Sequence, residues 1–295
     1  VVGITAYQDA SIPPLNYADK DASLFAQWLQ SRPGGSIPSY QIKLFTNQDA
    51  TIAVVYNSLD WVKEKAKSGD IVYIYFSGHG DVETKDNVSQ GYLLAWNSPP
   101  NNYRNHALSV KDLNDVANTL TTKNNAKVVL ITDACHSGKM AGDFYKGKQL
   151  TAHNLNLVLN NQVRLSSCKE DEEAAEGPAW GGGRGVFSYY LLMGLNGKAE
   201  KDDIVRLQDL QVFLNTSFKN DLTLKAENHK QNPVIDGNPT FPLAVVDTLV
   251  LKMINKSNAI VKSNTSGLQS LKSLGPQPMD YFFAIAKGAR FDGLL

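Results

Sequence analysis

Two apolar runs of strand length, each ending in small residues and one reactive side chain, constrain the possible fold most strongly. Residues 71–76 lead into Ser-Gly-His-Gly, which contains His79, and residues 128–132 lead into Asp-Ala-Cys-His-Ser-Gly, which contains Cys135. Short runs that are apolar on both faces are typical of strands in the middle of a parallel sheet with helices on both sides. Ligands of such sheets bind beyond the carboxyl ends of the strands. We therefore expect His79 and Cys135 to lie at one edge of one sheet.

The segments around these two runs alternate between strand and helix patterns. Strand-like runs at 1–6, 41–45 and 71–77 are separated by residues 19–30 and 52–62, in which apolar side chains recur at helical spacing. That order predicts a parallel sheet with right-handed crossovers. The later elements are expected as strands at 91–96, 127–133 and 162–167, and as helices at 109–120, 151–159, 187–195 and 207–218.

A thiol and an imidazole at the same sheet edge predict nucleophilic chemistry. Cysteine attacks as the thiolate, and a neighbouring imidazole can take its proton and later protonate the leaving amine. We assign Cys135 as the nucleophile and His79 as the general base and acid, with the N–H groups of Gly78 and Cys135 as the oxyanion hole. A zinc site made of these two side chains with Asp133 and His136 is an alternative, although close-spaced ligand pairs are lacking.

The two blocks resemble the catalytic blocks of the caspase-like cysteine peptidases, specifically metacaspases and bacterial orthocaspases. A third block at 166–172 and 183–192 is similar to the segment that follows the nucleophile in that family, and residues 1–4 and 17–22 also fit. The resemblance implies a caspase-like three-layer α/β/α sandwich with a mostly parallel central sheet. It also implies a cysteine endopeptidase that acts on protein or peptide substrates.

The residue two positions before the nucleophile bears on specificity. Asp133 would lie near the pocket that holds the side chain preceding the scissile bond, and a partly buried carboxylate there pairs with a basic group. In metacaspases the matching acid contributes to selecting basic residues. We therefore predict cleavage after Arg or Lys, with Asp133 as a specificity (S1) residue, although a structural role in tying down a loop stays open.

Caspase relatives are often cut between the nucleophile strand and the next strand, and basic residues occur in or near that interval here. The candidate self-cleavage sites are Lys139, Lys146, Lys148 and Arg164. Cutting at these residues would match the predicted specificity.

Calcium is the cofactor that the resemblance raises. Metacaspases usually carry an acidic segment after the histidine loop, but residues 90–97 contain no carboxylate. An acidic run could instead supply oxygen ligands through Glu170, Asp171, Glu172, Glu173 and Glu176. Such runs are more often solvated faces, so the metal stays unassigned and calcium activation stays open.

Composition restricts partners and compartment. Lys+Arg and Asp+Glu both number 29, so no overall field favours nucleic acid. The chain lacks an apolar run of the roughly 20 residues that a membrane helix needs. Its two cysteines, Cys135 and Cys168, do not make a disulfide framework, and a reduced thiol suits the cytoplasm. We expect a peptidase domain at 1–246 and a C-terminal extension at 247–295 of unknown role, with an unknown oligomeric state; a targeting segment before Val1 is not excluded.

Two rival functions remain open. The first is a latent caspase-fold scaffold or interaction module that retains the dyad but keeps the site closed. The second is a thioesterase or acyltransferase that uses the same dyad and is indifferent to Asp133. The reactivity of the Cys135 thiol distinguishes the first rival, and turnover of simple thioesters distinguishes the second.

Overall fold

The computed structural model describes residues 1–85, 87–134, 161–169 and 172–246. A six-stranded sheet forms its middle layer, in the order β12-β8-β7-β3-β1-β2. The strands are β1 (Val2–Gly3), β2 (Phe45–Thr46), β3 (Ile71–Ser77), β7 (Lys127–Asp133), β8 (Gln162–Ser166) and β12 (Val234–Gly237). Neighbours from β2 to β8 pair in parallel, whereas β12 runs antiparallel to β8. The mostly parallel sheet confirms the predicted fold class.

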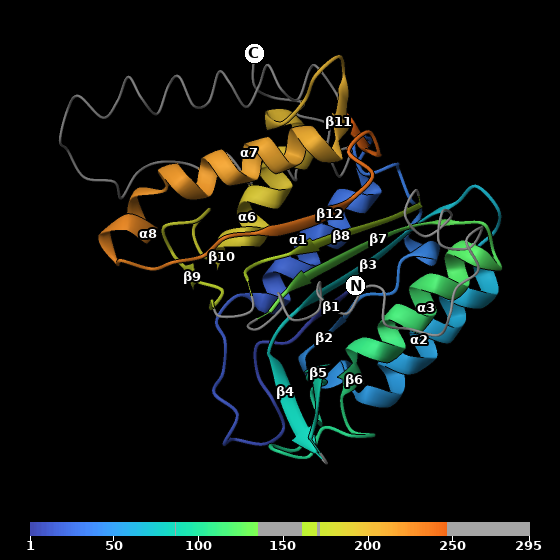
Figure 1. The fold of residues 1–295 in the computed structure, drawn as a ribbon, viewed down its shortest axis with the longest axis vertical. Coiled ribbons are helices and arrows are strands. Elements are labelled where there is room, and N and C mark those ends of the chain that lie inside the picture. The colour runs from blue at the N-terminus through green and yellow to red at the C-terminus, as the bar shows by residue number, and fades with distance from the viewer. Residues whose placement is uncertain (86, 135–160, 170–171, 247–295) are drawn as a thin grey trace, which may run out of the picture.

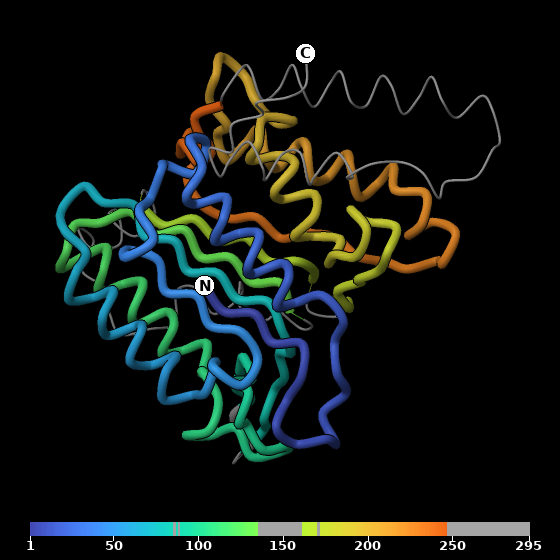
Figure 2. The backbone as a smooth tube through the Cα atoms, turned by 180° about the vertical axis from the view of Figure 1, so that it is seen from behind, coloured from blue at the N-terminus to red at the C-terminus, as the bar shows by residue number. Residues whose placement is uncertain are grey.

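Helices cover both faces of this sheet (Figure 1, Figure 2). They are α1 (Ala18–Gln30), α2 (Ile52–Lys65), α3 (Val110–Thr122), α6 (Val186–Met193), α7 (Leu207–Asn220) and the short α8 (Leu222–Ala226). In Figure 1, α2 and α3 lie side by side on one face, and α1, α6 and α7 lie on the other. The three layers are those of an α/β/α sandwich. No helix in the described ranges is long and apolar enough to cross a membrane.

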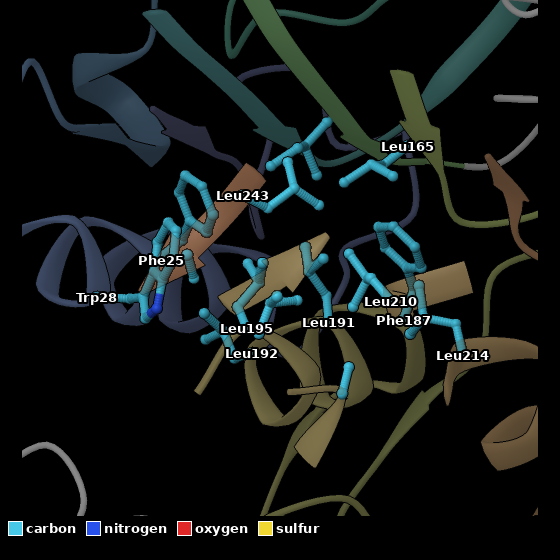
Figure 3. Packing of buried hydrophobic residues seen from close by; sticks show 14 of the residues in the cluster. Phe25, Trp28, Leu165, Phe187, Leu191, Leu192, Leu195, Leu210, Leu214 and Leu243 are labelled. Atoms are coloured by element: carbon cyan, nitrogen blue, oxygen red, sulfur yellow. The ribbon is translucent and has the colours of Figure 1, made fainter. Parts of the chain in front are cut away.

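Side chains alternate in direction along the central strands and so contribute to two separate cores. In β7, Val129 and Ile131 join the core against α1, α6 and α7, while Val128 and Leu130 join the core against α2 and α3. Figure 3 shows the first core, where Phe25 and Trp28 of α1 lie toward Leu192 of α6, and Leu210 and Leu214 of α7 lie beside Phe187. Burial on both faces explains why these strands read as continuous apolar runs.

Smaller sheets surround the central one. They consist of β4 (Gly80–Lys85), β5 (Val88–Leu93) and β6 (Leu108–Ser109); β9 (Glu176–Gly177) and β10 (Arg184–Gly185); and β11 (Ile204–Arg206) and β13 (Pro242–Val245). Short 3-10 turns occur at Ser39–Gln41 and Asn47–Asp49, and Gly194–Lys198 continues α6 as a π-helical turn.

Several element boundaries differ from the sequence prediction. The polar segment after His79, for which the sequence analysis names no strand, forms β4 and pairs with β5 in an antiparallel hairpin. Pairing of the backbone does not require apolar side chains, so a two-sided polar strand escapes a pattern search. The first two strands are shorter than expected, with β1 limited to Val2–Gly3 and β2 to Phe45–Thr46. The expected helix at 151–159 and the extension at 247–295 lie outside the described residues, so the boundary at 246 stays a prediction.

Candidate active site

The register between β3 and β7 determines where the two reactive side chains enter. The strands pair residue by residue from Ile71 and Lys127 to a last pair, Ser77 with Asp133. His79 and Cys135 each follow that last pair by two positions. Neighbouring strands lie about 4.8 Å apart, so β3 and β7 end side by side at the same edge of the sheet. Cys135 itself lies outside the described residues.

His79 is held through both its backbone and its ring. Its Nε2 lies 2.7 Å from the carbonyl oxygen of Pro13, in the segment between β1 and α1. Its backbone N–H donates to the Tyr7 hydroxyl at 2.7 Å, and the Tyr7 ring lies 5.2 Å from the imidazole, centroid to centroid. A carbonyl only accepts hydrogen bonds, so Nε2 must carry the proton here. In neutral His79 the free lone pair is then on Nδ1, which suits it as a base.

Neither Tyr7 nor Pro13 was predicted from the sequence. The Pro13 contribution is a backbone carbonyl, which any residue would provide, so no side-chain pattern announces it. Tyr7 is an isolated aromatic residue in an irregular segment, and no period or spacing distinguishes it from a packing residue.

Gly78 uses its backbone N–H inside the sheet. The N–H donates to the carbonyl oxygen of Asp133 at 3.1 Å, which continues the β3–β7 pairing by one step. A Cβ at this position would come 2.9 Å from the Tyr7 hydroxyl oxygen, so glycine allows that side chain to approach. Because its N–H is already engaged, Gly78 is not free to donate to an oxyanion in this arrangement.

Asp133 lies buried at the end of β7, with 6% of its surface exposed. Its Oδ2 accepts hydrogen bonds from the hydroxyl and the N–H of Ser188, at 2.6 and 3.2 Å, in the first turn of α6. Burial raises the pKa of this carboxyl to about 7, the charge of Asp21 adds to the rise, and the Ser188 hydrogen bonds oppose it. Among the described residues, no cation forms an ion pair with Asp133.

A second carboxylate, Asp21, lies beside Asp133. It belongs to the first turn of α1, is 1% exposed, and forms an ion pair with Nε of the equally buried Arg184. Its Oδ2 also accepts from the N–H of Gly185 at 2.8 Å. The Arg184 Nη2 donates to the carbonyl of Ser188 at 3.5 Å, and Nη1 has no hydrogen-bond partner among the described residues. The pairing of α1 with β10 spans more than 160 positions, so the sequence contains no local signal for it.

Gly185 separates the two carboxylates. A Cβ placed there would come 2.8 Å from Oδ2 of Asp133 and 3.0 Å from Oδ2 of Asp21. Its own φ of −64° suits any residue. The lack of a side chain, and not backbone freedom, is therefore what this position needs.

We expect Gly185→Ala to lower the free energy of unfolding by about 1–3 kcal/mol, because the added methyl group overpacks the space between two buried carboxylates. Urea titration measures this loss. The matched control is Gly182→Ala, whose Cβ meets no atom within 4 Å although its φ is +72°. The control should lose less stability, through backbone strain alone. An equal loss of stability in both variants would show that the two carboxylates are not what excludes a side chain at position 185.

Arg164 is a correction to the predicted self-cleavage sites. It lies in the middle of β8, is 4% exposed, and its guanidinium contacts the side chain of Asn114 on α3. Its strand pairs with β7 on one side and β12 on the other, so its peptide bonds cannot enter a protease cleft without unfolding the sheet. Lys139, Lys146 and Lys148 lie outside the described residues.

In the described part of the acidic run, two carboxylates form hydrogen bonds with distant segments of the chain. Glu172 accepts from the N–H and the amide of Asn232 at 2.7 and 2.6 Å, and Glu176 accepts from the N–H and the amide of Asn16, both at 2.7 Å. The two carboxylates therefore serve different partners. No group of three or more His, Cys, Asp or Glu side chains in the described ranges could hold a metal ion. Glu170 and Asp171 lie outside those ranges.

Cys168 is the thiol that the structure describes, and it is fully buried. Its Sγ lies 3.3 Å from the carbonyl oxygen of Glu172. Such a thiol is shielded from reagents in solution, so probes of thiol reactivity should report on Cys135 in the folded protein.

Comparison with known proteins bears on the family and the fold. A family model for the caspase domain matches residues 1–243. A solved structure of a protein from Geobacter sulfurreducens is similar with a TM-score of 0.55 at 15% identity, over 83% of this chain and 97% of that one. A structure described as pro-sf-caspase-1 is similar with a TM-score of 0.50 at 13% identity, over 83% and 88% of the two chains. A search of curated proteins finds no match. At such identities the two structures support the fold alone.

Proposed function

Since the chain belongs to the caspase domain family, we propose that it is a cysteine endopeptidase that cleaves after arginine or lysine. The observation that carries the proposal is the state of His79, whose Nε2–H is bound by the Pro13 carbonyl. That bond leaves Nδ1 as the basic atom at the sheet edge where β7 ends, two residues before Cys135 in the sequence.

The reaction proceeds through an acyl-enzyme. Nδ1 of His79 takes the proton of the Cys135 thiol, and the thiolate sulfur attacks the carbonyl carbon of the scissile peptide bond. The tetrahedral intermediate collapses when the C–N bond breaks, and the imidazolium donates its proton to the leaving amine. Water then attacks the thioester with His79 as base, which releases the new carboxylate and restores the thiol.

We propose Gly80, in place of Gly78, as the partner of the Cys135 N–H in the oxyanion hole. The N–H of Leu94 in the β5 segment donates to the carbonyl of His79 at 3.0 Å, so β5 lies on the side to which that carbonyl points. N–H groups alternate in direction along an extended strand, so those of Gly78 and Gly80 both point away from β5. The Gly78 N–H meets Asp133. The Gly80 N–H is then directed past the end of β7, where Cys135 follows.

Basic specificity follows from Asp133 and Asp21. Asp133 ends the nucleophile strand, and Asp21, which pairs with Arg184, lies beside it in α1. Their Oδ2 atoms lie 2.8 and 3.0 Å from the point where a Cβ of residue 185 would be. A guanidinium or ammonium group entering from a substrate would meet oriented carboxylate oxygens. An aspartate side chain would meet like charge, which disfavours the specificity of aspartate-cutting caspases.

Hydrolysis of matched fluorogenic peptides that end in Arg, Lys or Asp tests the proposal. We expect wild-type protein to cleave the Arg and Lys peptides and Cys135→Ala to cleave none, with calcium added to one arm and chelated in the other. Peptide mapping of the same incubations reports cuts after Lys139, Lys146 or Lys148, which we expect only with the intact thiol. Cleavage of the Asp peptide, or equal activity in Cys135→Ala, would overturn the proposal. Silence on every peptide would favour the latent scaffold.

A further inference from the structure

Three charged side chains form one buried cluster at the proposed specificity site. They are Asp21 of α1, Asp133 of β7 and Arg184 of β10, and they are 1%, 6% and 1% exposed. Two acids and one cation leave the cluster with a single net negative charge when all three groups are ionised.

We propose that Arg184 is a specificity-determining residue, because its pairing with Asp21 leaves Asp133 as the one carboxylate that awaits a cation from the substrate. The inference rests on the proposed function and deepens it, since it states the net charge that the cluster presents to a basic substrate side chain. One basic side chain then neutralises the cluster.

The contacts within the cluster support this division. The Arg184 guanidinium is committed to Asp21 through Nε and reaches the Ser188 carbonyl through Nη2. The hydroxyl and N–H of the same Ser188 bind Asp133. Arg184 is therefore separated from Asp133 by one residue, and its Nη1 has no hydrogen-bond partner in the described part of the chain. Ser188 therefore links Arg184 to Asp133, and without the charge of Asp21 these two groups would be the remaining charges of the cluster.

Other groups that face the cluster do not change the count of cations. Glu176 of β9 acts on Asp21 through its charge, and the hydroxyl of Tyr75 on β3 contacts Ser188 at 2.6 Å. Burial and the two aspartates raise the pKa of Tyr75 well above its ordinary value, so the phenol stays neutral. Lys20 donates to the carbonyl of Gly182 at 3.3 Å from an exposed position. It serves as a control because it is a nearby cation outside the cluster.

This charge count makes an unusual set of expectations for the variants. Asp21→Asn frees Arg184 to pair with Asp133, so the cluster becomes neutral although Asp133 is intact. Arg184→Met leaves Asp21 without its cation. The double variant Asp21→Asn/Arg184→Met keeps Asp133 alone and returns the cluster to one negative charge. A preference for arginine that is lost in Asp21→Asn and recovered in the double variant would be hard to explain by a purely structural ion pair.

The test compares kcat/KM for peptides ending in arginine or citrulline, its neutral isostere. We expect the Arg/citrulline ratio to fall about a hundredfold in Asp21→Asn, mainly through KM, and to recover to within about tenfold of wild type in the double variant. Lys20→Met should leave the ratio unchanged. A ratio that persists in Asp21→Asn, or stays low in the double variant, overturns the inference alone. Wild-type protein that cleaves neither peptide overturns the proposed function and the inference with it.

Thermal unfolding of wild type, the two single variants of the cluster and the double variant keeps the test informative if one variant is too unstable to assay. We expect each single substitution to lower Tm and the double variant to lie above Arg184→Met, because the double variant no longer buries the charge of Asp21 without its cation. The double variant alone also decides the matter, since a low Arg/citrulline ratio in that folded protein contradicts the charge count.

Discussion

Replacing His79 with glutamine should lower kcat about a thousandfold. The glutamine amide can still donate a hydrogen bond to the Pro13 carbonyl, which Nε2 of His79 contacts at 2.7 Å. Glutamine cannot, however, accept and return a proton at neutral pH. The variant therefore separates the position of the side chain from its proton chemistry. Steady-state hydrolysis of an arginine peptide measures the loss, and alkylation of Cys135 by iodoacetamide should slow in parallel, because the thiolate is no longer favoured.

Tyr7→Phe is the matched control for this experiment. It removes the hydroxyl that accepts from the His79 N–H but keeps the aromatic ring beside the imidazole. We expect a loss of less than about tenfold, because one neutral hydrogen bond contributes about 1 kcal/mol. Activity in His79→Gln comparable to that of Tyr7→Phe would argue against His79 as the catalytic base.

Asp133→Asn should produce two opposite effects, a large loss of function and a gain in stability. The asparagine oxygen can still accept both Ser188 hydrogen bonds, but the charge that attracts a basic substrate is gone. We expect kcat/KM for arginine peptides to fall by about two to three orders of magnitude.

The stability effect of Asp133→Asn follows from the raised pKa. The folded carboxyl titrates at about 7 and the unfolded one at 3.8, so the folded state retains its proton where the unfolded state has lost it. Wild-type stability therefore falls as the pH rises from 4 to 7, by about 4 kcal/mol for a shift of about three units. Asparagine does not titrate, so this part of the pH dependence should disappear.

Urea unfolding of wild type and Asp133→Asn at pH 5 and pH 8 measures the difference. From pH 5 to 8 the wild type should lose about 3 kcal/mol more than the variant. Parallel pH dependences would show that the carboxyl titrates normally in the folded protein. In that case burial would not raise the pKa of Asp133 in the folded protein.

Sequence reasoning was accurate where local pattern and sheet physics coincide. The apolar runs that became β3 and β7 are buried on both faces, and the abrupt change to small residues after each run marks the edge where His79 lies. It failed where a contact depends on distant segments. The Pro13 carbonyl and the Asp21–Arg184 pair become visible only when the chain is folded. The place of Arg164 near the interval after the nucleophile strand suggests a cleavage site, yet β8 buries this side chain against Asn114.

The placement of β7 and β8 bears on any self-processing of this chain. The interval that contains Lys139, Lys146 and Lys148 connects these two strands, which pair in parallel from Val128 and Gln162 to Thr132 and Ser166. A nick in that interval would create two polypeptides without opening the sheet, because the halves remain joined through backbone hydrogen bonds in the central layer. Glu176 from the second piece also binds Asn16 in the first. The product would be two polypeptides that share one core. The cut would break the chain without separating the strands that the two pieces contribute to the sheet.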